Sequence, residues 1–204
     1  MNNPAPTHVP IHDLLALRWS PRAFAERPVE ADKVHSLFEA ARWAPSSNNE
    51  QPWRFIVAGK EDEAQWNRLL ACLADGNRTW AFRAPMLILS IARLNFEQWD
   101  KPNRHALHDV GLATGNLVLQ ATALGLVARQ MAGFDVEKAR VDLNIPSGYE
   151  PVAMIAVGYP GDPNILPDRL RQREQTLRER NGISTFVFAG EWGKLLPLAP
   201  AQNE

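Results

Sequence analysis

A short basic segment near the N-terminus has the residue types of an anion site. Arg18-Trp19-Ser20-Pro21-Arg22 places one arginine on each side of a serine. A guanidinium group matches two phosphate oxygens at once, and a serine hydroxyl can add a third hydrogen bond. The proline restricts the backbone between them. The pattern fits a site for a phosphate monoester, and it also fits a basic turn exposed to solvent.

A second segment, residues 45–53, has the sequence PSSNNEQPW and joins a predicted helix to a predicted strand. Amide side chains offer both donors and acceptors. A heteroaromatic ring whose edge alternates C=O and N–H groups needs that mixture. The same side chains can instead satisfy the loop's own backbone in Asx and Ser turns. The polar candidates are Ser46, Ser47, Asn48, Asn49 and Gln51, with Pro52 setting the chain direction and Trp53 offering apolar cover.

A third segment, Arg178-Glu179-Arg180, lies near the C-terminus. Two arginines two positions apart project to the same side only where the chain is extended. The alternative is a charged helix end, since the segment DRLRQRE precedes it. Binding to RNA is a further alternative, but the interspersed acidic residues Asp168 and Glu174 argue against a basic patch.

Other motifs in the sequence carry less chemistry. The chain has no Gly-x-Gly-x-x-Gly segment and no P-loop. His105 and His108 lie at the start of a predicted long helix, where a catalytic role competes with that of ordinary exposed polar residues. The single cysteine, Cys72, sits in the apolar run LLACLA, which predicts a buried and inert thiol.

Composition limits the classes of partner. The chain has 204 residues, of which 45% are hydrophobic and 22% charged, with a formal net charge of -1. No global field therefore draws it to nucleic acid or to a membrane surface. The longest apolar run, PMLILSIA, is far shorter than the roughly 20 residues of a membrane helix. With one cysteine and no signal-peptide pattern, the expectation is a cytoplasmic protein.

Hydrophobic periodicity predicts a single α+β domain, with a mixed sheet flanked by helices. The strongest helix, residues 105–124, carries small residues on several faces, so it is expected to pack on more than one side and to reach a subunit interface. The expected organisation is an N-terminal arm at 1–10, the domain at 11–190 and a C-terminal tail at 191–204. We expect helices at 11–17, 30–44, 61–73, 105–124, 135–143 and 169–179, strands at 54–59, 86–92, 125–132, 152–158 and 184–188, and a polar loop at 75–85.

Five segments, in order and spacing over residues 11–190, resemble the FMN-dependent nitroreductase family. RWSPRAF at 18–24 is similar to that family's Arg-x-Ser-x-Arg/Lys-x-Phe, and PSSNNEQPWRFIV at 45–57 to its Pro-Ser-x-x-Asn-x-Gln-Pro-Trp loop and strand. Residues 108–135 resemble its central helix and following strand, and VGYPGDP at 157–163 its Gly-Tyr-Pro strand exit. Arg178 and Arg180 fall where the family has a basic pair.

The resemblance implies a nitroreductase-like fold and a homodimer of domain-swapped type. One FMN would lie at each subunit interface, and the C-terminal segment would wrap over the partner subunit. It further implies a ping-pong reaction, in which hydride passes from NADH or NADPH through flavin N5 to an electron-poor acceptor. The acceptor would be a small molecule such as a nitroaromatic or a quinone. Neither nucleic acid nor membrane is an expected partner, and no metal and no catalytic side chain are implied.

The resemblance also assigns the cofactor residues by position. Arg18 would bind the FMN phosphate, with Arg178 and Arg180 completing the clamp. Arg22 would reach the ribityl or pyrimidine side and stabilise the reduced flavin. The residues of the loop 45–51 would come from the other subunit, and Gln51 would support that loop rather than contact FMN directly. The full implied set is Arg18, Trp19, Ser20, Arg22, Pro45, Ser46, Ser47, Asn49, Gln51, Asn77, Gln130, Met131, Gly133, Arg178 and Arg180.

Two positions depart from the family pattern. Ala132 stands where many members carry a glutamate before Gly133-Phe134, and Trp80 stands where some have a lysine that hydrogen-bonds the flavin. The missing acidic group keeps a second hypothesis open: the same FMN site used for dehydrogenation, dehalogenation or flavin fragmentation. A flavin-sequestering protein without enzymatic activity is a third hypothesis.

Overall fold

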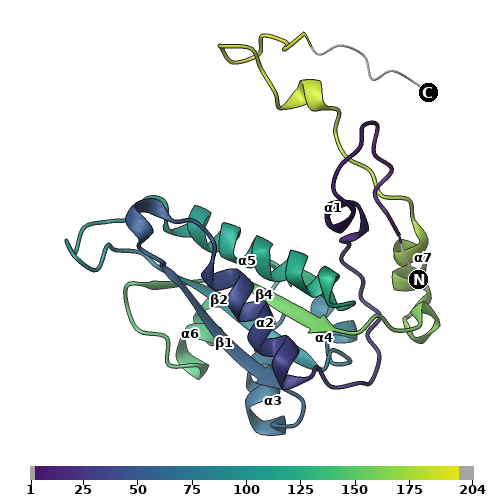
Figure 1. Ribbon diagram of the computed structural model, residues 1–204. Helices are drawn as coiled ribbons and strands as arrows, with labels where there is room; N and C mark the ends of the chain where they lie inside the picture. The colour runs from purple at the N-terminus through teal and green to yellow at the C-terminus, as the bar shows by residue number, and fades with distance from the viewer. Residues whose placement is uncertain (1–2, 198–204) are drawn as a thin grey trace.

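The computed structural model describes residues 3–197, and residues 1–2 and 198–204 lie outside that range. Within it the chain forms one sheet of four strands: β1 (Trp53–Gly59), β2 (Met86–Arg93), β4 (Tyr149–Gly158) and β3 (Val127–Met131). Their order across the sheet is β1-β2-β4-β3, and each neighbouring pair is antiparallel (Figure 1). The expected α+β class is confirmed, but the sheet is antiparallel in all three pairings and not mixed as expected.

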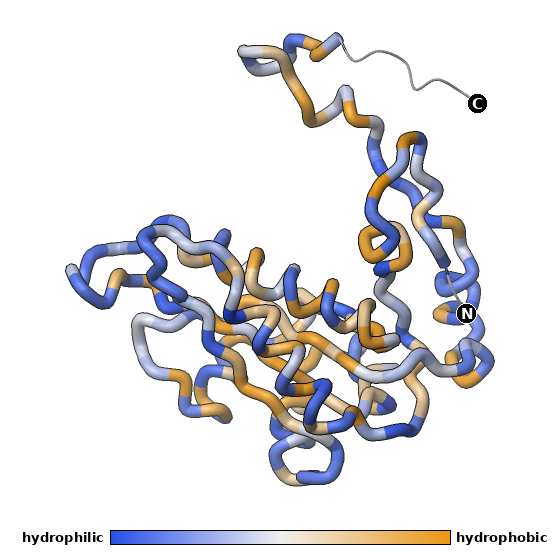
Figure 2. The backbone as a smooth tube through the Cα atoms, viewed as in Figure 1, coloured by the Kyte–Doolittle hydropathy of each residue, from blue (hydrophilic) through white to orange (hydrophobic). Residues whose placement is uncertain are grey.

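Helices cover both faces of this sheet. Helices α2 (Ala31–Arg42) and α5 (Ala106–Ala123) pack on one face, and α3 (Glu63–Cys72), α4 (Asp75–Ala81) and α6 (Val136–Asp142) pack on the other. Successive side chains of a strand point to opposite faces. Leu87 and Leu89 of β2 accordingly join the core on the α3 side, whereas Met86 and Ile88 join the core beneath α5. The apolar residues gather in this layered body (Figure 2).

Helix α5 is the long helix that the periodicity predicted. Val110, Ala113 and Leu117 are fully buried on its sheet-facing side. Gly125 has φ +73, the left-handed conformation that ends helices at little cost when no Cβ is present. On the opposite side, a Cβ added at Gly111 or Gly115 would meet nothing within 4 Å, so another backbone could approach closely there.

Two expected elements are wrong. Residues 75–85 do not form a polar loop, because Asp75–Ala81 is helix α4. The helix begins with the polar residues DGNRT, but its inward face buries Trp80 and Ala81. Residues 184–188 do not form a strand: Ile183–Thr185 is a 3-10 helix, and Phe188 makes one isolated bridge to Leu195. A strand needs a partner strand, and none of the described strands pairs with this segment.

The N-terminal arm and helix α7 meet beside the sheet. Helices α1 (Asp13–Leu17) and α7 (Asp168–Gln175) lie together near the N-terminal arm (Figure 1). The arm is tied down by Asn3, whose side-chain amide donates to Thr176 O at 3.3 Å, and by Ala5 N–H, which donates to Ala16 O at 2.8 Å. Short 3-10 helices at Ser47–Asn49 and Pro163–Ile165 complete the elements.

Residues 183–197 project away from the body (Figure 1). The hydrogen bonds of this segment are local, such as Thr185 N–H to Gly182 O and Ala189 N–H to Lys194 O. Phe186 and Trp192 are 63% and 92% exposed. Part of the expected tail, residues 198–204, lies outside the described residues, and the division at 10 and 190 stays a prediction.

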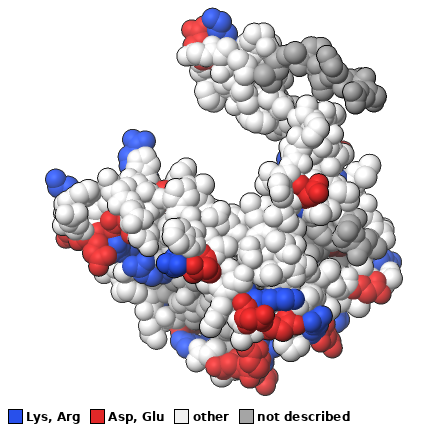
Figure 3. Space-filling view, in the orientation of Figure 1, with Lys and Arg blue, Asp and Glu red and all other residues white. Residues whose placement is uncertain are grey.

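No helix among residues 3–197 is long and apolar enough to cross a bilayer. Figure 3 shows acidic and basic side chains interspersed over the visible face of the body. Several arginines gather in a cavity beside α7.

Candidate functional site

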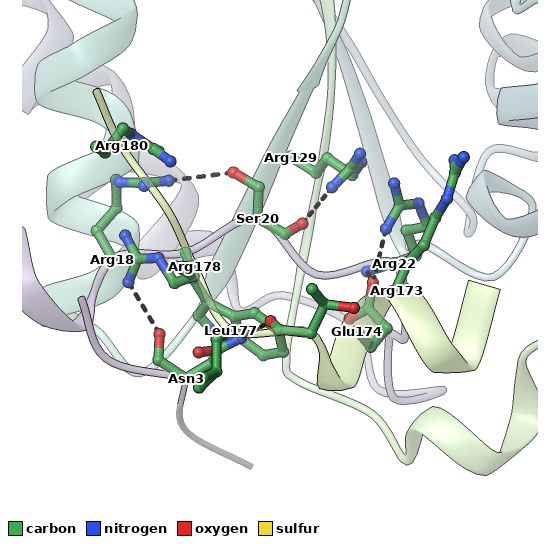
Figure 4. A pocket seen from close by; sticks show the side chains of 12 residues that line it. Asn3, Arg18, Ser20, Arg22, Arg129, Arg173, Glu174, Leu177, Arg178 and Arg180 are labelled. Atoms are coloured by element: carbon green, nitrogen blue, oxygen red, sulfur yellow. Dashed lines mark hydrogen bonds and ion pairs between the residues drawn. The ribbon is translucent and has the colours of Figure 1, made fainter. Parts of the chain in front are cut away.

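A cavity of about 340 Å³ lies where the segment 18–22, strand β3 and the end of α7 converge. Among the described residues that line it, six are arginines and one is a carboxylate, Glu174. Four of these arginines are half-buried, and such an excess of positive charge favours a bound anion. Figure 4 shows Arg18, Arg178 and Arg180 on one side of Ser20, and Arg22, Arg129 and Arg173 with Glu174 on the other.

The first side of the cavity holds the expected phosphate residues. Arg18 Nη1 donates to Ser20 Oγ at 3.1 Å, which leaves the hydroxyl proton of Ser20 for another acceptor. Burial lowers the pKa of Arg18, and the charge of Arg180 lowers it further. Burial followed by repulsion from Arg18 and Arg180 also lowers the pKa of Arg178. These three guanidinium groups therefore destabilise one another until an anion enters.

Arg178 has a second role in the structure. Its Nη1 donates to Asn3 O at 2.9 Å and to Ala16 O at 3.0 Å, so it fixes the N-terminal arm against α1. Arg180 is exposed, and its Nη1 donates to the neighbouring Glu179 O at 2.6 Å. The structure thus brings both C-terminal arginines to the cavity expected of them, with Arg178 already engaged by backbone carbonyls.

The second side of the cavity is organised by Glu174. Its Oε1 accepts from Arg22 N–H at 2.9 Å and from Arg22 Nη1 at 3.1 Å. The carboxylate is 3% exposed, and burial raises its pKa while the bonds from Arg22 act in the opposite direction. Arg129 Nη1 donates to Ser20 O. Burial lowers the pKa of Arg129 to about 10, and repulsion from Arg22 adds to the effect.

Trp80 lies under this second side. It is 1% exposed, stacks on Phe24 with ring centroids 6.3 Å apart, and carries Arg129 above its ring at 5.4 Å. Its position therefore supports Arg129. The cation–π contact holds the guanidinium group against the core.

The residues expected along the flavin ring follow β3 away from the cavity. Gln130, Ala132 and Gly133 are exposed, whereas Met131 is buried. Asn77 of α4 donates from Nδ2 to Gly133 O at 2.9 Å, and a Cβ added at Gly133 would meet that same nitrogen at 2.9 Å. A side chain at 133 would thus displace Asn77. The structure places Asn77 beside Gly133, as a shared site requires.

The loop 45–51 is built in a strained backbone conformation. Asn48, Asn49 and Gln51 have φ values of 52, 55 and 50. Non-glycine residues in this left-handed region each cost on the order of 1 kcal/mol or more and tend to cluster at functional sites. Ser46 Oγ accepts from Gln51 N–H at 3.0 Å, and the Gln51 side chain donates to Asn49 O at 3.0 Å. Ser46 and Gln51 therefore stabilise the loop itself, while Asn49 faces solvent.

Two charged anchors hold this loop from outside. The carboxylate of Asp109 on α5 accepts from Ser47 N–H at 3.0 Å and is 2% exposed. Glu50 forms an ion pair with Arg93 of β2, and its Oε1 also accepts from Glu97 N–H at 2.8 Å. Both side chains of the Glu50–Arg93 pair are nearly buried, so the loop is fixed rather than free to adapt.

The loop and the arginine cavity lie at opposite ends of α5. Asp109, which holds Ser47, is in the first turn of the helix. Trp19, which lines the cavity, also lines a smaller hollow with Thr122 and Gly125 at the far end. Eighteen helical residues span about 27 Å. A single chain therefore does not bring the two expected halves of the site together.

A model of one protein family matches this chain. The nitroreductase family model covers residues 15–159, which include the segment 18–22, the loop 45–51, α5 and β3. The chain belongs to the nitroreductase family. The resemblance of the sequence motifs is thereby confirmed.

Two relatives of this nitroreductase-family protein match it over most of their length. An uncharacterized 15.4 kDa protein of Mycolicibacterium smegmatis is 34% identical over 149 residues, covering 70% of this chain and 99% of that protein. A Stenotrophomonas maltophilia protein, whose name assigns it provisionally to the NADH dehydrogenase/NAD(P)H nitroreductases, is 29% identical over 72% of this chain and 83% of its own.

Solved structures extend the likeness to the fold. The crystal structure of an oxidoreductase containing FMN matches with a TM-score of 0.89 and 34% identity, covering 95% of this chain and 98% of that one. An FMN-dependent nitroreductase of Clostridium difficile matches with a TM-score of 0.61 and 28% identity, covering 71% and 84%. The first match covers 95% of the chain, whereas the family model ends at residue 159.

Sequence patterns alone missed three residues of this nitroreductase-family site. Arg129 lies in a predicted strand, where an arginine directly after the apolar residues 126–128 was the available signal. Glu174 was hidden in the charged run DRLRQRE, although it lies four positions after the half-buried Leu170 and so shares its inward face. Asp109 follows His108, whose Nδ1 lies 3.0 Å from Asp109 Oδ1, and no sequence pattern singled it out.

Proposed function

We propose that this protein is an FMN-dependent oxidoreductase that transfers hydride from NADH or NADPH to a small electron-poor acceptor, such as a nitroaromatic or a quinone. The observation that carries the proposal is the cavity of six arginines around Ser20. An anionic group must balance that charge, and a phosphate monoester at the end of a flavin supplies one. The FMN named for one structural neighbour at 34% identity supports the choice of cofactor.

The donor set of the cavity fits the phosphate end of FMN. The charge of Arg180 lowers the pKa of Arg18 after the effect of burial, and a bound phosphate would relieve that repulsion. Ser20 accepts its hydrogen bond from Arg18 and retains its own proton to donate. Arg178 would contribute charge and fix the arm that closes the cavity. The residues present therefore suit this cofactor.

The edge of the sheet beyond the cavity suits the flavin ring. From Arg129 to Gly133 the chain advances four residues, or about 13 Å at roughly 3.3 Å per residue. The exposed residues Gln130 and Ala132, with the backbone of Gly133, would lie along the ring. Asn77 would add an amide beside Gly133.

The loop 45–51 would come from a second copy of the chain. It lies at the opposite end of α5 from the cavity, and Asn49 faces outward. The free side of α5, with Leu107 52% exposed and open space beside Gly111, offers a surface for a partner helix. We infer a homodimer in which each FMN site combines the arginine cavity of one subunit with the loop of the other.

Bound FMN would supply the redox chemistry, taking hydride from NAD(P)H and passing it to the acceptor in a second half-reaction. The protein would bind, orient and tune it. Arg18, Ser20 and Arg180 would hold the phosphate, and Ser47 and Asn49 would meet the ring edge. Arg22 would stabilise negative charge on the pyrimidine side. Protein acid–base groups are not needed for this sequence of events.

A second chemistry on the same site is favoured by one observation. Ala132 is exposed at the expected reactive edge, where many family members carry an acidic side chain. Without that carboxylate the site would suit a different substrate or donor, as in dehydrogenation, dehalogenation or flavin fragmentation. The alternative keeps the FMN site and changes only the reaction.

Anaerobic reduction separates these proposals. Purified protein should be yellow or should take up added FMN, and NADH or NADPH should bleach it. A panel of nitroaromatics and quinones should then restore the colour. Protein that fails to bind FMN would contradict both proposals. Bleaching by dithionite but by neither nucleotide would favour the alternative chemistry.

A further inference from the structure

Glu174 is the one carboxylate among the described residues that line the arginine cavity. We propose that Glu174 is a positioning residue for the cofactor site, which fixes Arg22 and offsets one of the three arginine charges on its side of the cavity. The phosphate would then be directed to the opposite side, where Arg18 and Arg180 lie. This inference rests on the proposed FMN site and adds a residue to it.

The contacts of Glu174 show what it fixes. One oxygen, Oε1, accepts from both the backbone N–H and the side-chain Nη1 of Arg22, at 2.9 and 3.1 Å. A single carboxylate thus sets the backbone and the guanidinium group of the same residue. Because Glu174 belongs to α7 and Arg22 to the N-terminal region, the pair also joins these two distant segments of the chain at the cavity.

The charges of the cavity are divided by this contact. Arg22 has a carboxylate partner within hydrogen-bond distance, whereas Arg18 pairs with the neutral Ser20. Figure 4 shows Glu174 on the side of Arg22, away from Arg18 and Arg180. An incoming anion would therefore find the stronger uncompensated field beside Arg18. Glu174 repels it from the other side.

Two polar atoms on the side of Glu174 lack partners. Glu174 Oε2 and Arg129 Nε are both buried without a hydrogen bond to any described residue. Buried polar atoms of this kind are rare, and an ordered water or ligand group commonly satisfies them. The carboxylate therefore retains a second acceptor oxygen, buried beside the one that holds Arg22.

The negative charge of Glu174, close to the proposed FMN site, should change the midpoint potential of the flavin. Reduction adds negative charge to a flavin, so a nearby carboxylate disfavours the reduced form and lowers the midpoint potential. Arg22 is proposed to have the opposite effect, because its positive charge would stabilise the reduced flavin. Glu174 would weaken that stabilisation and so would help to set the midpoint potential of the flavin.

The variants Glu174→Gln and Glu174→Ala separate charge from positioning. A glutamine keeps an oxygen for Arg22 but loses the charge. We expect Glu174→Gln to bind FMN more tightly, by roughly tenfold, and to raise the midpoint potential. Glu174→Ala should bind FMN more weakly than Glu174→Gln, because it no longer fixes Arg22. Glu137→Gln, on the exposed surface of α6, is the matched control.

The measurements are FMN titration by fluorescence, at low and high salt, and the midpoint potential of the FMN-loaded protein. Unchanged affinity and potential in Glu174→Gln, beside a wild type that binds FMN, would overturn this inference and leave the proposed function standing. A wild type that does not bind FMN would instead remove the proposed function. A merely structural role for Glu174 would lower thermal stability without raising the potential.

Glu174→Asp serves if Glu174→Gln does not yield folded protein. It keeps the charge but shortens the reach to Arg22. We expect the wild-type potential with weaker FMN binding. Unchanged affinity in Glu174→Asp would contradict the positioning role, and a raised potential would contradict the charge role.

Discussion

The carboxylate of Asp109 accepts a hydrogen bond from the backbone N–H of Ser47, with 3.0 Å between Oδ2 and N. This bond joins the first turn of the central helix to the loop that carries the amide side chains. It is buried, with Asp109 2% exposed. The conformation of the loop is therefore set by the helix beneath it as well as by its own sequence.

The variant Asp109→Ala should release the loop. The Ser47 N–H would lose its partner, at a cost of about 1–3 kcal/mol. We expect roughly tenfold weaker FMN binding and faster proteolytic cleavage within residues 45–51. Asp109→Asn retains an acceptor oxygen and should lose much less affinity. Equal losses in both variants would show that the negative charge, and not the hydrogen bond, is what matters.

The variant Arg18→Ala tests the phosphate end of the site. A hydrogen bond to a charged group contributes about 1.5–3 kcal/mol, so FMN affinity should fall by roughly 10- to 100-fold. Turnover by the FMN-loaded fraction should change far less. The control is Arg169→Ala, which removes an exposed arginine of α7 outside the cavity. An unchanged dissociation constant for FMN in Arg18→Ala would refute the phosphate assignment.

Mixed dimers test whether the site is shared between subunits. Arg18→Glu damages the cavity, and Asp109→Ala damages the loop. When the two variants are coexpressed, one site of each mixed dimer combines two intact halves. Random pairing should restore about a quarter of the FMN sites. The count is made by FMN titration, as the fraction of sites that keep the wild-type dissociation constant. No recovery, with mixed dimers verified by differently tagged chains, would place both halves in one subunit.

The pH dependence of stability should reveal the contact between Glu30 and Tyr159. The Tyr159 hydroxyl donates to Glu30 Oε2 at 2.6 Å and, with lesser help from the backbone and from Arg27, lowers the pKa of that carboxyl to about 2. A lowered folded-state pKa contributes stability above the ordinary value of 4.5, which is lost as the pH falls toward about 2. The melting temperatures of wild type and Glu30→Gln should therefore converge over that range, as measured by thermal unfolding at each pH. A constant difference across the range would show that the carboxylate has no such role.

Much of the fold follows from local sequence pattern. The periodicity of residues 105–124 predicts α5, and Gly125 predicts its end, because helix formation and termination depend on neighbours along the chain. The segment Asp75–Ala81 was mistaken for a loop because its helix buries little beyond Trp80 and Ala81, whose partners come from distant parts of the chain. The strand expected at 184–188 failed for a related reason, since pairing depends on a partner and not on propensity alone.

The sequence by itself determined the family and the chemical character of the site. The motifs contain arginines beside a serine and amide side chains in a loop, and each of these features can be read from neighbouring residues. Only the tertiary structure decided which of these residues meet. It brought Arg129 and Glu174 to the N-terminal arginines, and it separated the loop from them by the length of α5. Such distances arise from packing between elements remote in sequence, and a buried ion pair such as Arg22–Glu174 has no local signature that distinguishes it from a solvated charge.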